Sequence, residues 1–230
     1  MAISKERIVN IPALHEDYAF AEVSRKYPEM MESFAQFLEL RHLYDAAIRE
    51  IITKLEILDT EFQLKFRHNP IYSIESRLKS PNSIFQKLKR RGLSLNLKSA
   101  QESLYDIAGI RVICNYIDDL YTVESLLLRQ TDIELVEQKD YVKNPKRNGY
   151  RSLHIVVTVP VFLSDKTVPT PVEIQLRTIA MDYWASLEHK LRYKSKPEQV
   201  ENYGAQLSDC ADKLAGIEQT MQEIHRNIGS

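Results

Sequence analysis

Apolar residues in the first third of the chain recur at intervals of three and four, the spacing that gathers them on one face of an α-helix. The series consists of Phe34, Phe37, Leu38, Tyr44, Ile48, Ile51, Leu55, Leu58 and Phe62. Pro28 suits a position near the start of this helix. Pro70 interrupts the pattern, because proline cannot continue a helix and restricts the residue before it. The pattern therefore predicts one long N-terminal helix.

The middle of the chain begins with a short helix and then changes to strand patterns. Pro81 suits the first turn of that helix and Gly92 suits its end. Period-two alternation and β-branched runs then predict strands near 110–114, 133–142, 153–161 and 168–176, with a helix over 118–129. Asn148-Gly149 and the segment 163–166 are turn signals between the later strands. We expect an α+β fold, a mixed β-sheet flanked by helices.

Two more helices are expected after these strands. The first covers about 178–191 and carries the only tryptophan, Trp184. The second opens at Pro197, and its apolar residues alternate steps of four and three: Tyr203, Leu207, Cys210, Leu214, Ile217, Met221, Ile224 and Ile228. A seven-residue repeat of this kind is typical of a coiled-coil seam. Two interpretations stay open, a helix–helix contact between subunits and packing of the helix on its own domain.

Composition and charge limit the classes of protein. Hydrophobic residues make up 43% of the chain and charged residues 27%, so a soluble globular protein with a real core is expected. The net charge of −1 excludes a globally basic nucleic-acid coat, so any polyanion site must come from local clustering. No apolar run reaches 18 residues, and the charged N-terminus is unlike a signal peptide. Cys114 and Cys210 lack metal or CxxC spacing, which favours the reducing cytoplasm.

Two local clusters of positive charge stand out from this neutral background. The segment 77–98 holds seven basic residues and no acidic one: Arg77, Lys79, Lys87, Lys89, Arg90, Arg91 and Lys98. Such a face suits a polyphosphate, although a solvated basic helix has the same composition. The second cluster is Lys143, Lys146, Arg147, Arg151 and His154 around Tyr150. It could hold a nucleotide by stacking its base on the tyrosine ring, or be an ordinary hairpin.

A pair of carboxylates completes the candidate chemistry. In the strand 172–177 the apolar residues point one way, while Glu173, Gln175 and Arg177 point the other. Asp106 comes just before the strand near 110–114, so it could lie at the mouth of the same sheet. Two carboxylates on adjacent strands suit Mg²⁺, which keeps most of its waters and bridges phosphate oxygens. Alternatively, Glu173 pairs with a basic neighbour on a solvated sheet face. Together with the two basic clusters, the pair predicts phosphoryl-type transfer between nucleotides.

Four segments of the chain resemble the synthetase domain of the RelA/SpoT family, in order and with similar spacing. They are YDIAGIR at 105–111, NGYRSLH at 148–154, VEIQLRT at 172–178 and WASLEHK at 184–190. The resemblance covers about 68–194 and is closer to the RelP branch than to RelQ. It implies a sheet of the nucleotidyltransferase type and a stand-alone synthetase that transfers pyrophosphate from ATP to the 3′-hydroxyl of GDP or GTP. The product would be the alarmone (p)ppGpp.

The resemblance also assigns roles to individual residues. Asp106 and Glu173 match the Mg²⁺-associated acids, and Glu173 also matches the promoter of 3′-hydroxyl attack. On the ATP side, Arg77 and Arg111 match residues that stack on adenine. The ATP phosphates are matched by Lys79, Lys87 and Arg90. On the acceptor side, Tyr150 matches the ring that stacks on guanine, and Lys146 and His154 match contacts to the phosphates. Gln175 and Asp182 match groups near the guanine and the ribose.

The organisation expected for the whole chain follows from the same resemblance. Residues 1–67 would form an N-terminal helical extension, 68–194 the synthetase domain and 195–230 a C-terminal helix for oligomer contact. Small family members are similar in forming homotetramers. The family's alarmone hydrolases carry an His-Asp metal motif, and no His-Asp dipeptide occurs here, so synthesis without hydrolysis is expected.

Two rival functions remain at this point. A relative could pyrophosphorylate another 3′-hydroxyl, such as that of an adenine nucleotide or a tRNA end, although a net charge of −1 supplies little extra basic surface and RNA binding is not indicated. A non-catalytic nucleotide or RNA binder is the other class, and the presence of both Asp106 and Glu173 argues against it. The preference among GDP, GTP and GMP cannot be deduced from the sequence.

Overall fold

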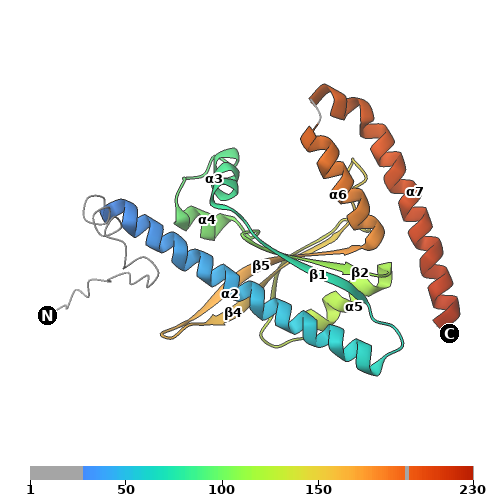
Figure 1. The fold of residues 1–230 in the computed structure, drawn as a ribbon, viewed down its shortest axis with the longest axis horizontal. Coiled ribbons are helices and arrows are strands. Elements are labelled where there is room, and N and C mark those ends of the chain that lie inside the picture. The colour runs from blue at the N-terminus through green and yellow to red at the C-terminus, as the bar shows by residue number, and fades with distance from the viewer. Residues whose placement is uncertain (1–27, 195–196, 230) are drawn as a thin grey trace.

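The computed structural model describes residues 28–194 and 197–229, which form a five-stranded sheet with helices around it (Figure 1). The helices are α2 (Pro28–Lys65), α3 (Pro81–Arg90), α4 (Leu97–Ser103), α5 (Ile117–Leu128), α6 (Ile179–Lys194) and α7 (Pro197–Gly229). The strands are β1 (Ile71–Leu78), β2 (Ala108–Cys114), β3 (Glu134–Asp140), β4 (Leu153–Phe162) and β5 (Thr167–Thr178). The expected α+β fold with long terminal helices is confirmed.

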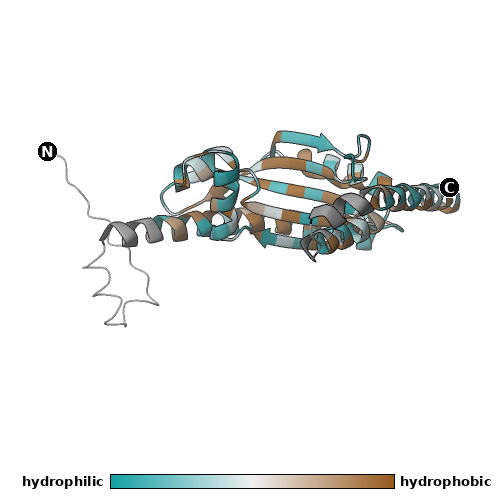
Figure 2. Ribbon diagram, turned by 90° about the horizontal axis from the view of Figure 1, so that it is seen from above, coloured by the Kyte–Doolittle hydropathy of each residue, from teal (hydrophilic) through white to brown (hydrophobic). Residues whose placement is uncertain are grey.

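The sheet is mixed, with the strand order β1-β2-β5-β4-β3. Only β2 and β5 run parallel, and the other three pairs are antiparallel. Successive side chains of a strand point to opposite faces, and the strands show alternating polar and apolar bands in Figure 2. One face of the sheet is therefore apolar and available for a helix, whereas the other carries polar groups.

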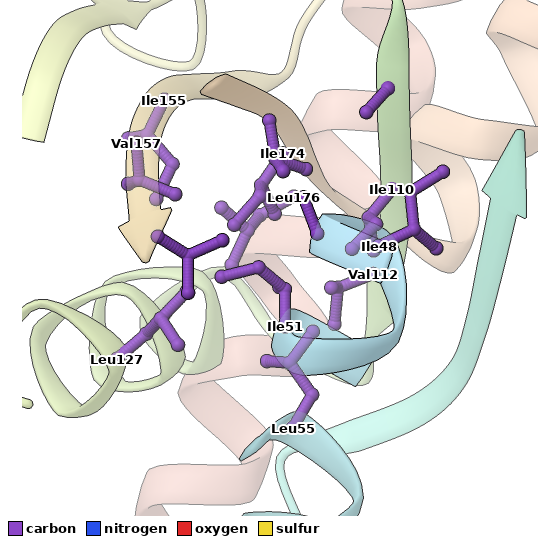
Figure 3. Packing of buried hydrophobic residues seen from close by; sticks show 14 of the residues in the cluster. Ile48, Ile51, Leu55, Ile110, Val112, Leu127, Ile155, Val157, Ile174 and Leu176 are labelled. Carbon is purple, nitrogen blue, oxygen red and sulfur yellow. The ribbon is translucent and has the colours of Figure 1, made fainter. Parts of the chain in front are cut away.

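Helix α2 packs on the apolar face and closes the main core (Figure 3). Its residues Ile48, Ile51 and Leu55 lie among side chains of the central strands, which include Ile110, Val112, Ile174 and Leu176. Leu127 of α5 fills the neighbouring space. Truncating a fully buried residue such as Ile51 to alanine should cost about 2–5 kcal/mol. The N-terminal helix is thus part of the sheet's own core.

Capping, proline and glycine signals in the sequence agree with the boundaries of helix α3. Ser80 caps α3 by accepting a hydrogen bond from the Ser83 backbone, Pro81 occupies its first position, and Gly92 follows with a φ of 68°. The expected helices after Arg177 and from Pro197 are also present. Two elements were not expected, the edge strand β1 and the short helix α4. None of the helices that the structure describes is long and apolar enough to cross a membrane.

Helix α7 packs on its own domain, but not through the whole of its heptad seam. It runs beside α6 and reaches α5 (Figure 1). Two seam residues, Leu207 and Leu214, pack on the domain beside Ala211, and the polar residues Glu218 and Gln222 also face it. Six seam residues stay exposed: Tyr203, Cys210, Ile217, Met221, Ile224 and Ile228. A contact between subunits through this seam stays a prediction.

Candidate active site

The polar face of the sheet carries two rows of side chains that cross all five strands. In one row, strand pairing aligns Glu75, Arg111, Gln175, His154 and Lys139. In the adjacent row it aligns Arg77, Gly109, Glu173, Val156 and Glu137. Seven of these ten residues are charged or titratable, and together they come from every strand. The sheet therefore brings together groups that lie far apart in the sequence.

Two clefts open on this face. The first has a volume of about 440 Å³ and is lined by Glu75, Ser76, Arg77, Lys79, Asp106, Gly109, Ile110, Arg111, Glu173 and Gln175. The second has a volume of about 400 Å³ and is lined by Lys87, Arg91, Ser103, Tyr105, Asp106, Glu137, Lys139, Tyr141, Lys146, His154, Val156 and Glu173. Asp106 and Glu173 line both clefts, so the two carboxylates mark the boundary between them.

Asp106 is held ionised by two lysines. Lys79, just after β1, and Lys87 of α3 both donate hydrogen bonds to its Oδ2 atom. Burial works against ionisation of Asp106, but these bonds outweigh it and lower the pKa of the carboxyl below its usual value. The Oδ1 atom is buried and has no hydrogen-bond partner within the protein. Asp106 thus offers one free acceptor at the junction of the clefts.

Glu173 is held ionised by a different set of groups. Burial raises its pKa, yet His154 and Gln175 overcome that effect and leave the pKa lowered. Gln175 donates a hydrogen bond of 2.9 Å to Oε2, and Nδ1 of His154 lies 3.6 Å from Oε1. Both neighbours come from the same row of the sheet. At neutral pH the site therefore presents two carboxylates.

A chain of hydrogen bonds connects Glu173 to the Tyr150 loop. The buried Arg177 donates bonds of 2.8 Å to the Tyr150 hydroxyl and to Oε1 of Gln175. The hydroxyl also lies 2.8 Å from Nε2 of His154. Because the hydroxyl accepts from Arg177, its own proton is available for Nε2, and the imidazole proton then lies on Nδ1, toward Glu173. These bonds hold the ring of Tyr150 and the carboxylate of Glu173 in fixed positions relative to one another.

Lys146 lies over two aromatic rings, of which Tyr141 lines the second cleft and Tyr150 lines neither of the two clefts. The Nζ atom of Lys146 is 4.4 Å from the ring centroid of Tyr141 and 4.6 Å from that of Tyr150. The backbone brings it there through a turn in which Gly149 donates a 2.8 Å hydrogen bond to the Lys146 carbonyl. Gly149 has a φ of 88°, a conformation that glycine adopts without strain. The sequence had indicated this turn.

Asp182 lies between Arg111 and Arg177 and lines neither of the two clefts. It accepts a 3.0 Å hydrogen bond from Arg177, and its Oδ1 lies 3.5 Å from Arg111. Arg111 is the expected adenine contact, and Arg177 holds the Tyr150 hydroxyl. The carboxylate therefore links the two sides of the site, a role that the expected acceptor contact did not include.

Of the other four expected ATP contacts, three line one of the two clefts and Arg90 does not. Arg77 and Lys79 line the first cleft, as a contact to the same ligand requires. Lys87 lines the second cleft and reaches the boundary through Asp106. Arg90 lines neither of these two clefts, whereas its neighbour Arg91 lines the second and donates a hydrogen bond to the Ser103 carbonyl. The helix thus turns Lys87 and Arg91 toward the site.

Sequence reasoning gave no role to three residues that the structure brings to the site, Lys139, Tyr141 and Arg177. Arg91 belonged to the expected basic cluster, but the resemblance had selected its neighbour Arg90 as the phosphate contact. The alternation of β5 had placed Arg177 beside Glu173 and Gln175, so a signal for it existed. Lys139 and Tyr141 belong to an exposed edge strand and its end, where no pattern distinguishes a ligand contact from a solvated side chain.

The donor groups fit a hard divalent cation that keeps part of its hydration shell. No cluster of three or more potential metal ligands is found among the described residues. Mg²⁺ is usually held by one or two carboxylates together with substrate phosphates and water, so Asp106 and Glu173 are sufficient. The free Oδ1 atom of Asp106 and the ionised state of both acids agree with that requirement.

Comparison of the sequence with known proteins identifies a family. The chain matches the family described as "Region found in RelA / SpoT proteins" over residues 76–198. It is 40% identical over 186 residues to the GTP pyrophosphokinase YwaC of Bacillus subtilis, which covers 81% of this chain and 89% of YwaC. It is 33% identical over 185 residues to the GTP pyrophosphokinase YjbM of the same organism, covering 80% and 86%.

Solved structures extend the likeness to the fold. The small alarmone synthetase 1 of Bacillus subtilis, bound to its product pppGpp, matches with a TM-score of 0.77 and 31% identity, over 85% of this chain and 99% of that one. The small alarmone synthetase 2 of the same organism matches with a TM-score of 0.74 and 38% identity, over 83% and 98%. This chain therefore belongs to the RelA/SpoT family, among its small alarmone synthetases.

Proposed function

We propose that the chain transfers the β,γ-pyrophosphate of ATP to the 3′-hydroxyl of GDP or GTP, releasing AMP and forming (p)ppGpp. One observation carries this proposal. Two ionised carboxylates, Asp106 and Glu173, stand at the boundary of two adjacent clefts that are lined with cations. Two nucleotides that react with each other need two adjoining sites and acid groups where they meet. The names of the relatives YwaC and YjbM support the guanine acceptor.

ATP is assigned to the first cleft. Arg77 and Arg111 lie on neighbouring strands there, and their planar guanidinium groups suit stacking on adenine. Lys79 lies at the boundary beside Asp106, where it can meet the phosphates. A solved complex of small alarmone synthetase 1 with AMPCPP, which matches this chain with a TM-score of 0.70, supports an adenine nucleotide site in the fold.

The acceptor is assigned to the second cleft. Arg91, Lys139, Lys146 and His154 line that cleft and suit the acceptor's phosphates, while Lys87 lies at its boundary beside Asp106, where it can meet the phosphates of ATP. Tyr150 lies beside Lys146 and offers a ring for the guanine base. This arrangement brings the ribose toward Glu173, the carboxylate that both clefts share.

The chemical step is an in-line displacement at phosphorus. The acceptor's 3′-oxygen forms a bond to the β-phosphorus of ATP while the bond between that phosphorus and the α,β-bridging oxygen breaks, and AMP leaves with that electron pair. Glu173 is ionised and accepts a hydrogen bond from the 3′-hydroxyl, and the proton passes to this carboxylate as the new bond forms. Lys79 and Lys87 stabilise negative charge that develops on the phosphates.

Mg²⁺ is the proposed cofactor, with Asp106 and Glu173 as its protein ligands. When bound, the ion supplies charge neutralisation and orientation of the phosphate oxygens. The protein contributes the fixed carboxylates and the cations around them. The proposal assigns synthesis alone, without hydrolysis, and places the enzyme in the cytoplasm, where both nucleotide substrates are available.

We also propose a homotetramer, with the exposed α7 seam as one of its contacts. Five large apolar residues of one helix are exposed in a repeat that suits a second helix. Light scattering after gel filtration tests this assembly. Ile217→Glu and Ile224→Glu should each give a smaller particle without loss of helical circular dichroism, and a wild-type monomer would contradict the proposal.

The first experiment is a direct assay of the reaction. The purified chain is incubated with Mg²⁺, ATP and either GDP or GTP, and the nucleotides are resolved by anion exchange. We expect AMP together with a guanosine tetraphosphate or pentaphosphate, and neither product with Glu173→Ala. A parallel reaction with deacylated tRNA tests the rival acceptor.

Each outcome of this assay has a definite meaning. The absence of AMP with both guanine nucleotides, from a protein whose circular dichroism shows it to be folded, would refute the proposal. AMP formation with tRNA alone would favour a tRNA-modifying relative. Guanine nucleotide binding without turnover would favour the non-catalytic binder.

A further inference from the structure

Helix α7 touches the loop that carries Tyr150, although most of the helix lies outside the segment that matches the family. The family match ends at residue 198, whereas the contacts come from residues 207–218. The Gly149 backbone lies directly against α7, because a Cβ atom added there would be 2.5 Å from the Cβ of Ala211. The chain at this loop therefore rests on the helix with no room for a side chain.

Arg151 attaches the other side of the same loop to α7. It donates hydrogen bonds of 3.3 Å to the Ala211 carbonyl and 3.1 Å to the Asp212 carboxylate. The Arg151 side chain is mostly buried, whereas that of Asp212 is exposed. Tyr150 thus lies between two residues that are each held by the same turn of α7.

The ring of Tyr150 also packs on α6 and α7. Tyr150 packs against a small cluster of buried residues, Trp184, Ala185 and Ala211, against which Leu207 and Leu214 of α7 also pack. Trp184 donates a 2.9 Å hydrogen bond from its indole nitrogen to the Leu207 carbonyl, which fixes α7 against α6. The aromatic ring assigned to guanine therefore has α7 as part of its support.

A third attachment joins α7 to the end of β5. Thr178 donates a hydrogen bond to Glu218 of α7, and Thr178 directly follows Arg177 in the chain. Arg177 holds the Tyr150 hydroxyl, so the hydroxyl end of this side chain is positioned by the chain neighbour of a residue attached to the helix. The three attachments share one stretch of α7.

We propose that Ala211 and Asp212 of α7 are positioning residues for the acceptor, which hold the Tyr150 loop in the conformation that binds the guanine nucleotide. The inference rests on the proposed function, because it concerns the acceptor side of that site. Neither residue lines the two clefts, so both act through Gly149, Tyr150 and Arg151. The main contacts of α7 are with α6 and α5, whereas Arg77 and Arg111 of the ATP side lie on β1 and β2, so ATP binding should be independent of these residues.

The test compares kinetic constants for the two substrates. Ala211→Leu places a larger side chain against Gly149 and should displace the loop, whereas Ala211→Ser fits the space and serves as the conservative variant. Because misplacement by about 1 Å can cost roughly 100-fold, we expect the KM for GDP to rise about tenfold or more in Ala211→Leu. The KM for ATP should stay within about twofold of wild type, and Ala211→Ser should resemble wild type.

Asp212 gives a second variant that cannot fail through loss of folding, because its side chain is exposed. Asp212→Ala should raise the KM for GDP about threefold, and the effect should vanish in the Arg151→Ala background if the two residues act together. Lys213→Ala is the matched control, since Lys213 pairs with Asp209 on an exposed part of the same helix. It should leave both constants unchanged.

Binding of a fluorescent GDP analogue, followed by titration, separates this inference from the proposed function. If the wild-type chain makes no AMP but binds the analogue, the proposed function fails, and the weaker binding expected for Ala211→Leu still tests the positioning role. If the wild type is active and the variants change both KM values equally or neither, the positioning role is wrong. No binding of guanine nucleotide by the wild type would overturn both.

Discussion

The two sides of the active site are built in different ways. On the acceptor side, Arg177 joins Tyr150, Gln175 and Asp182 in one network of hydrogen bonds, and helices α6 and α7 support the loop from behind. On the ATP side, the side chains of Arg77 and Arg90 make no hydrogen bond or ion pair with the other residues that the structure describes. Arg111 meets only carboxylates, Glu75 and Asp182, at 3.3 and 3.5 Å.

We infer from this difference that internal contacts hold the acceptor side in place, whereas Arg77 on the ATP side gains partners only from its ligand. A preformed network lowers the entropy that binding must remove, and it favours one ligand shape. Free guanidinium groups retain side-chain freedom and respond to any phosphate or base that enters. We therefore expect substitutions on the acceptor side to affect both folding and binding, and those on the ATP side to affect binding alone.

The largest effect should come from Glu173, the carboxylate that belongs to both sides. Glu173→Gln keeps the size of the side chain but removes its charge, so it weakens the contact to the 3′-hydroxyl and the cation site. We expect kcat to fall about 1,000-fold, with guanine nucleotide binding retained. Initial-rate assays and a binding titration measure both. A variant with more than a tenth of wild-type kcat would show that Glu173 is not the catalytic carboxylate.

Arg177 and Arg77 form a matched pair that tests the comparison directly. Arg177→Lys cannot maintain both planar hydrogen bonds from a buried position, so we expect a loss of about 1–3 kcal/mol in the free energy of unfolding and a KM for GDP raised more than tenfold. Arg77→Lys should raise the KM for ATP several-fold and leave the melting temperature unchanged. Thermal unfolding and kinetics on both variants give the result. Equal stability of the two would contradict the difference between the sides.

A smaller change isolates the Tyr150 hydroxyl from its ring. Tyr150→Phe retains the surface for base stacking but removes the group that joins Arg177 and His154. The loss of one such hydrogen bond is worth about 1 kcal/mol, so the KM for the acceptor should rise roughly fivefold. Tyr150→Leu is the control, because it also removes the aromatic ring and should bind less well than Tyr150→Phe. If the two variants bind guanine nucleotide equally, the ring has no stacking role.

The smallest expected effect concerns stability as a function of pH. Glu218 and Glu173 should contribute to it with opposite signs. Burial raises the pKa of Glu218, so its contribution to stability is present below the unfolded pKa and is lost as pH rises through the folded pKa. Glu173 has a lowered pKa, so its contribution is present above the unfolded pKa and is lost as pH falls through the folded one.

These signs lead to opposite shifts of the melting temperature near pH 7.5. Glu218→Gln should raise it by roughly 1–3 °C and Glu173→Gln should lower it, with both differences fading below about pH 4, where the carboxyls are protonated. Melting curves across this range check the signs. A lower melting temperature for Glu218→Gln at pH 7.5 would show that the buried charge stabilises α7.

Hydrophobic pattern was sufficient for the elements that contribute to the core. Buried strands and α2 have strong periodicity, and their boundaries agree with the sequence within a few residues. Strand β1 was missed because it lies at the sheet edge, where polar residues such as Ser73, Glu75 and Arg77 interrupt the apolar pattern. Helix α4 is short and has a single buried residue, Ala100, so it gives no periodic signal.

The site was partly predictable, because charge clusters and the family resemblance identify residues but not their partners. The pairing of Asp106 with Lys79 and Lys87 depends on how the chain folds around α3. The position of Asp182 between two arginines needs strands and helix together. The contact of α7 with the Tyr150 loop was hidden, since its tightest point joins Ala211, which is not a heptad residue, to a glycine.

The pairing of β2 with β5 also determines when the active site forms during folding. These parallel strands are separated in the chain by α5, β3 and β4, so their contact is the least local in the sheet. Loop-closure entropy makes such contacts slow to form, whereas β1 and β2 can pair earlier. Since Asp106 leads into β2 and Glu173 lies on β5, the two carboxylates meet only when this last pairing closes. A partly folded or partly synthesised chain therefore has no complete site, and its basic segments remain without catalytic effect until the sheet is whole.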